Sequence, residues 1–228
     1  MKCRATATAL GRCNAGAALT EFALSLPLLL TAGLWGVEVA HKAVMQMRLS
    51  QVAVLVADNA SRVGENSLLG ETKLYEADID DVLIGAEVQG GTAFGLYDRG
   101  RVILSSLEVV PETEDRQYIH WQRCMGKRHD ASSYGAAGEG LQGTFPGMGP
   151  LGEEIQAVNG EAVMFVEVVY EYEPLFAKLF VKSTTLTATA AFNVRQNRDL
   201  SQIYQRDPSN PDPVANCDRF DSSGLGVG

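Results

Sequence analysis

The chain has 228 residues, of which 46% are hydrophobic and 21% charged, a balance that is ordinary for a globular protein. Its formal net charge is −9, and all 28 acidic residues come after residue 16. Because an acidic surface repels phosphate groups, the composition argues against nucleic acid and anionic lipid headgroups as partners.

A basic segment and then a long apolar run open the chain. Residues 1–16 contain no acidic side chain and three basic ones: Lys2, Arg4 and Arg12. Residues 22–40 carry a single charge, Glu38. As a helix this run would extend about 28 Å, close to the hydrocarbon thickness of a bilayer. A cleavable secretory signal has a shorter apolar core of about 7–15 residues. We therefore expect a single membrane pass, with the basic segment on the cytoplasmic side.

The helical pattern continues beyond the apolar run. Six apolar residues recur at spacings of three and four, which places them on one face of a helix: Met45, Leu49, Val52, Val56, Ala60 and Val63. Gly64 then provides a stop signal. We predict one helix over residues 17–64, with a transmembrane half at 22–40 and an outer half that presents an amphipathic face to a soluble domain.

Residues 65–200 have the pattern of a small α+β domain. A short helix is predicted over residues 76–88, and strands are predicted at four places: 101–110, 116–124, 163–172 and 186–194. The last two strands alternate between apolar and polar side chains, which is typical of antiparallel strands with one face in water. The predicted fold class is therefore α+β, with the long N-terminal helix packed on a small antiparallel sheet.

Two segments are predicted to lie outside the core. Residues 131–160 are rich in glycine and indicate a long exposed loop, and residues 201–228 indicate a polar tail with little to bury. Within the loop, GEGLQG at residues 138–143 fits the G-x-G-x-x-G pattern of dinucleotide sites. The sequence after it, TFPGMGPLG, cannot begin the helix that such a site requires, so we expect no such site.

The positions of the cysteines predict one disulfide bond. Cys3 and Cys13 lie in the basic segment, whereas Cys124 and Cys217 lie in the body and form the only possible pair outside the cytoplasm. An oxidising compartment favours their pairing. The bond would join the tail to the end of a strand.

The sequence offers no pattern for catalysis or metal binding. His120, Cys124 and His129 are possible zinc ligands within ten residues, but a fourth ligand of matching spacing is absent. Asp80 and Asp81 are adjacent, and we expect them to be solvated rather than to act as an acid and base pair. We therefore predict no enzyme activity, no cofactor and no metal.

The stretch GAALTEFALSLPLLL, which begins at Gly16, and the following GVEVA resemble the start of TadE-like minor pilins or pseudopilins of the Flp, or tight adherence, type IV pilus system. The later VEVVYEYEPLF and TLTATAAFNVR are similar to the C-terminal strands of that family. The resemblance implies cleavage between Gly16 and Ala17 by a prepilin peptidase, and an assembly role for Glu21, at the fifth mature position, and for Phe22. It also implies three kinds of partner: other pilin or pseudopilin subunits, an inner-membrane assembly platform, and membrane lipid. The expected location is the bacterial inner membrane, with the C-terminal domain in the periplasm, and the expected roles are pilus assembly and adhesion.

Glu21 has a physical explanation on this interpretation. A carboxylate in hydrocarbon costs several kcal/mol unless it finds a partner or lies near the interface. Cleavage would give Ala17 a new α-amino group only about 6 Å along the helix axis, and the glutamate of this family is thought to attract the amino terminus of a neighbouring subunit. Two alternatives stay open: Glu21 lies at the headgroup boundary, or the whole chain is an unprocessed single-pass membrane-anchored periplasmic binding module that uses the loop 131–160.

Overall fold

The computed structural model describes residues 15–65, 70–91, 94–176 and 183–220. The chain divides into two compact units, one of residues 1–43 with 174–182 and the other of residues 44–173 with 183–228. Residues 1–14 of the predicted leader and residues 221–228 of the predicted tail lie outside the described part.

Helix α1 (Ala15–Arg62) contributes to both units and includes Pro27. After the helix, the N–H of Val63 still donates to the carbonyl of Asn59, and Gly64 turns the chain with a φ of +135°. A side chain at Gly64 would place its Cβ 2.6 Å from Cγ2 of Thr72, so glycine is required here. The helix predicted over residues 17–64 is thus confirmed to within two residues at each end.

Four antiparallel strands form one sheet in the order β2, β1, β3, β4. The strands are β1 (Gly100–Val109), β2 (Gln117–Met125), β3 (Val163–Tyr172) and β4 (Thr184–Asn193). The pairing of β1 with β2 shifts register between Ser106 and Leu107. A long N-terminal apolar helix with a small antiparallel sheet confirms the predicted α+β layout.

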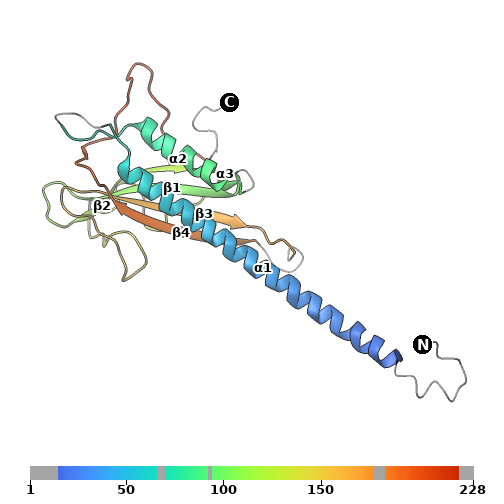
Figure 1. Ribbon diagram of the computed structural model, residues 1–228. Coiled ribbons are helices and arrows are strands. Elements are labelled where there is room, and N and C mark those ends of the chain that lie inside the picture. The colour runs from blue at the N-terminus through green and yellow to red at the C-terminus, as the bar shows by residue number, and fades with distance from the viewer. Residues whose placement is uncertain (1–14, 66–69, 92–93, 177–182, 221–228) are drawn as a thin grey trace, which may run out of the picture. The chain divides into compact units, whose positions relative to one another are not determined.

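One face of the sheet packs against helices. Figure 1 shows the outer half of α1 and helix α2 (Glu76–Gly90) on the same side of the strands, and α3 (Leu96–Arg99) leads into β1. The α1 residues on this face follow the predicted spacing, and all but the half-buried Val63 are buried: Met45, Leu49, Val52, Val56 and Ala60. They share one core with alternate residues of β3, namely Met164, Val166, Val168, Tyr170 and Tyr172. The apolar side chains that recur every three or four residues in α1 therefore pack against those that recur every two residues in β3.

The second face of the sheet is covered at β3, where the expectation of a wet face was wrong, whereas most polar side chains of β4 are exposed as expected. On β3 the side chains of Phe165, Glu167 and Val169 are at most 5% exposed. A second apolar cluster includes Phe165 and residues of the segment 131–160, among them Met148, which is fully buried. The glycine-rich segment therefore covers this face instead of extending into solvent.

Backbone hydrogen bonds and close packing fix this cover. Gly138 donates to the carbonyl of Ile119 at 2.7 Å, and the N–H of Ile119 donates to Glu139 at 2.9 Å. Gly140 has a φ of +91°, and a Cβ there would collide with the carbonyl oxygen of Gln117. Glycine at this position allows the segment to approach the strand closely. The same composition that indicates an exposed loop thus permits a tightly packed one.

The tail is fastened to the sheet domain, contrary to the expectation that it has little to bury. Ala215 is buried, and the sulfur atoms of Cys124 and Cys217 lie 2.07 Å apart, which is disulfide bonding distance, across a separation of 93 residues. The predicted pair is therefore brought together.

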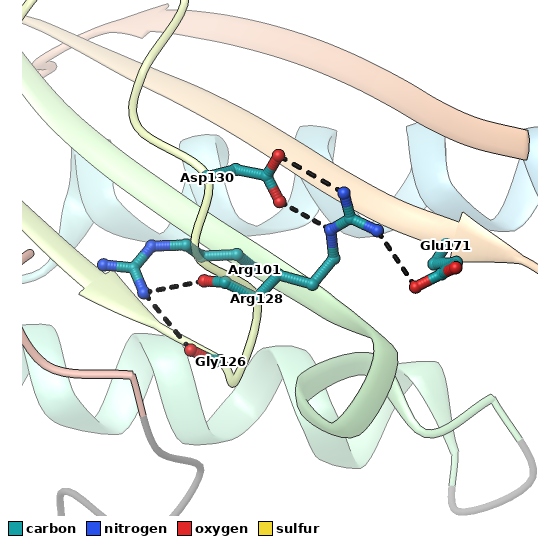
Figure 2. A network of polar contacts seen from close by, with 5 residues as sticks. All are labelled: Arg101, Gly126, Arg128, Asp130 and Glu171. Carbon is teal, nitrogen blue, oxygen red and sulfur yellow. Dashed lines mark hydrogen bonds and ion pairs between the residues drawn. The ribbon is translucent and has the colours of Figure 1, made fainter.

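A buried arginine holds the same part of the tail. Arg101 is fully buried in β1 and donates to the carbonyls of Cys217 and Arg219. It also donates to the carbonyls of Gly126 and Arg128, as Figure 2 shows. These acceptors are neutral, and burial lowers the pKa of the Arg101 guanidinium.

Candidate functional site

The four residues predicted to act in processing and assembly lie on the first turns of α1. Gly16 and Glu21 are exposed, and Phe22 is 58% exposed. The side chain of Ala17 is outside the described part. Nothing beyond its own helical turns lies within 4 Å of a Cβ built on Gly16. The backbone between Gly16 and Ala17 is helical.

The first half of α1 presents an apolar surface on every side. Its large exposed side chains are Leu19, Phe22, Leu24, Leu26, Leu28, Leu29, Leu30, Leu34, Trp35, Val37 and Val39. Among the described residues, α1 is the one helix that is long and apolar enough to cross a membrane. A helix that is apolar all round requires lipid or protein around it, since water cannot solvate such a surface favourably. The structure thus supports a single-pass membrane anchor.

Glu21 interrupts this apolar surface. No residue of the described part forms a hydrogen bond or ion pair with its side chain. Gly16 lies five residues earlier, about 7.5 Å along the axis at the α-helical rise. An ionised group among apolar side chains needs a partner or an aqueous boundary, so Glu21 is a candidate contact residue.

Glu38 is the second charge in the apolar half, and it is only 9% exposed. Its carboxylate accepts hydrogen bonds from the backbone N–H groups of Leu175 and Phe176, at 2.9 and 3.0 Å to Oε2. Both residues lie just after β3 and belong to the same compact unit as Glu38. Sequence reasoning did not identify this contact. The available signal was a charge inside an apolar run, together with two apolar residues next to the proline that follows β3.

The outer half of α1 has a second apolar stripe on the side opposite its own core. Val44, Met47 and Val54 are 46%, 62% and 45% exposed. Their spacings of three and seven residues keep them on one face. A groove of about 540 Å³ lies between α1 and α2, and its lining residues include Arg48, Gln51, Leu55, Gln89 and Gly91. Outside the membrane run the helix is therefore apolar on two faces, and the described part of its own domain covers one of them.

Asp80 differs from the solvated carboxylate that the sequence predicted. It lies on α2, it is 6% exposed, and no described residue donates to its Oδ1. Glu76, one turn earlier, forms an ion pair with Arg123. Burial, followed by the nearby charges of Glu76 and Asp212, raises the pKa of Asp80 to about 7. Asp81 is exposed, as expected.

The residues weighed as zinc ligands are engaged elsewhere. Cys124 is paired with Cys217, and His129 stacks on Phe220. His120 lies 3.0 Å from a carboxylate oxygen of Glu108. Within the described residues no group of three or more potential ligands could hold a metal ion. The segment after GEGLQG contains no helix between residues 143 and 160, so the dinucleotide pattern lacks its structural context.

No protein-family model, no curated protein and no solved structure matches the chain. Function is therefore inferred from the sequence motifs and the geometry described above.

Proposed function

We propose that the protein is a TadE-like minor pilin or pseudopilin of the Flp, or tight adherence, pilus system. A prepilin peptidase cuts it between Gly16 and Ala17, and α1 anchors the mature protein in the inner membrane with its α+β domain in the periplasm. Glu21 and Phe22 contact neighbouring subunits, and the protein primes or caps the fibre. Its role is structural rather than catalytic.

The observation that carries the proposal is the arrangement of the first turns of α1. A glycine and a glutamate lie five residues apart on an exposed helix, between a basic segment and an apolar run of membrane length. A glycine with an exposed glutamate nearby is common in proteins, but its placement between a basic segment and an apolar run of membrane length is not. It supports a site where a membrane-embedded peptidase and a neighbouring subunit act on adjacent residues.

The two apolar faces of the outer half of α1 also support assembly. One face is buried by the sheet, and the other, with Val44, Met47 and Val54, remains exposed. Exposed apolar stripes on helices are typical of helix-to-helix contacts between subunits. On this proposal the outer stripe and the membrane run each pack against helices of neighbouring subunits.

Processing provides the direct test. The full chain is expressed with a prepilin peptidase of the matching system, and the amino terminus of the product is sequenced. We expect a chain that begins at Ala17, and expression without the peptidase should give the uncut protein. Gly16→Leu should block cleavage, whereas Gly11→Leu, at the other glycine of the basic segment, should leave it intact. A mature chain that begins elsewhere would refute the proposal.

A second candidate is an unprocessed membrane-anchored binding module that uses the segment 131–160. Four exposed apolar side chains on this segment favour it: Leu141 at 45%, Leu151 at 97%, Ile155 at 37% and Val158 at 62%. Mass spectrometry of the protein from its native membrane distinguishes the two functions, because only processing removes residues 1–16.

A further inference from the structure

The turn after β3 contains two adjacent apolar side chains that the protein leaves in the open. Leu175 is 49% exposed and Phe176 is 52% exposed. Their backbone N–H groups both donate to Glu38, so the turn is held to α1 by its main chain while its side chains remain available. Such a turn presents apolar surface at a fixed place on the membrane helix.

The neighbours of Glu38 along α1 indicate where this place lies in a bilayer. Trp35, one turn before it, is 61% exposed, and Lys42, one turn after it, is also exposed. Tryptophan is enriched at the level of the headgroups, and lysine near a helix end extends into the interface. Glu38 is 17 residues from Glu21, about 25 Å along the axis, so the two carboxylates bracket a span close to the hydrocarbon thickness.

The hydrogen bonds of Glu38 explain how a charge is tolerated at this depth. A carboxylate near hydrocarbon needs donors, and unpaired backbone N–H groups near hydrocarbon need acceptors. Each satisfies the other here. Leu175 and Phe176 can therefore approach the lipid with their backbone N–H groups paired.

We propose that Leu175 and Phe176 insert into the headgroup and acyl boundary of the outer leaflet beside α1, as a second membrane contact that Glu38 positions. The ligand is the apolar part of the phospholipid, with no requirement for a particular headgroup, since the chain as a whole is acidic. This inference rests on the membrane anchor of the proposed function, but not on processing or on the pilus.

Depth-dependent fluorescence quenching tests the contact in the full chain. Trp35 and Trp121 are replaced by phenylalanine, and one tryptophan is introduced as Phe176→Trp, Leu29→Trp or Leu151→Trp. Each protein is reconstituted into phosphatidylcholine vesicles whose acyl chains are brominated near the headgroup or near the bilayer centre. Leu29 reports the apolar run of α1, and Leu151 is the exposed control on the segment 131–160.

We expect bromine near the headgroup to quench the tryptophan at position 176 strongly, and bromine near the bilayer centre to quench it much less. The tryptophan at position 29 should be quenched by bromine near the bilayer centre. The tryptophan at position 151 should not be quenched by either. Quenching at 29 without quenching at 176 would overturn this inference alone and would indicate that Leu175 and Phe176 contact a neighbouring subunit or water. Absence of quenching at 29 would overturn the membrane anchor as well.

Glu38→Ala in the Phe176→Trp protein tests the positioning role. The apolar run becomes more apolar, so insertion of α1 should persist, while the shallow quenching at position 176 should fall. Glu38→Gln keeps one acceptor oxygen and should restore part of the quenching. Undiminished quenching in Glu38→Ala would show that the carboxylate does not position the turn.

Discussion

Replacing Asp80 with asparagine removes a buried negative charge that lowers the free energy of unfolding above neutral pH. The carboxyl lies on α2, buried, and no described residue donates to its Oδ1. Glu76 and Asp212 add negative charge nearby, and Arg123, which pairs with Glu76, offsets only part of it. An amide at this position keeps the shape of the side chain and cannot ionise.

The size and sign of the effect follow from the pKa of Asp80. Its pKa is about 7 in the folded protein, against an ordinary value of 3.8. The folded state therefore binds this proton more tightly than the unfolded state. The stability from this group is fully present below pH 3.8 and is lost as the pH rises through about 7. At 1.36 kcal/mol per pKa unit, the loss amounts to about 4 kcal/mol.

Urea unfolding of the full chain in detergent micelles, followed by tryptophan fluorescence, measures this difference. Asp80→Asn should match the parent protein at pH 4 and exceed its free energy of unfolding by up to about 4 kcal/mol at pH 8. Asp81→Asn, at the exposed neighbouring position, should change it by less than about 0.5 kcal/mol at either pH. Parallel pH profiles for the parent and Asp80→Asn, or a less stable variant at pH 8, would refute the reasoning.

Three further changes probe other parts of the structure. Cys217→Ser should lower the free energy of unfolding by about 4–5 kcal/mol, which is the loop-entropy value for a loop of 93 residues. Reduction of the parent protein should lower it by a similar amount. If neither change shifts the urea midpoint, Cys217 is not bonded to Cys124. Phe165→Ala should cost about 3–5 kcal/mol in the same assay, because the side chain is 1% exposed, and a cost near zero would mean that the second face of the sheet is open to water. Glu21→Ala should leave the protein stable but reduce its recovery in purified pilus or assembly complexes, and wild-type piliation would argue against the pairing role.

The sequence predicted the parts of the fold that depend on periodicity. The spacing of Leu49, Val52 and Val56 identifies the inward face of α1, since a helix repeats every 3.6 residues, and the alternation in residues 163–172 identifies one core face of β3. The positions of Cys124 and Cys217 were sufficient to predict their pairing, because no other pair was possible in the body.

The contacts that sequence reasoning missed are not marked by any periodic pattern in the sequence. Met148 covers the second face of the sheet from a segment whose glycines indicate solvent exposure, and nothing local distinguishes its burial. Asp80 stands among polar neighbours, and one cause of its raised pKa is the charge of Asp212, which lies far away in the chain. Arg101 begins an apolar strand and looks like a residue at an exposed strand end, but its acceptors include carbonyls more than a hundred residues later. Such contacts depend on tertiary structure that local propensity does not encode.

Helix α1 and the tail contacts of Cys124 and Arg101 lie far apart in the sequence, and this separation sets an order of events during synthesis. A chain is made from its amino end, so α1 is complete before any strand exists. Cys217 and Arg219 follow both β3 and β4 in the chain. Cys124 and Arg101 can therefore contact these partners only after all four strands have been synthesised. On the proposed function, α1 therefore anchors the chain in the membrane before the sheet is complete, and the bond between Cys124 and Cys217 forms last.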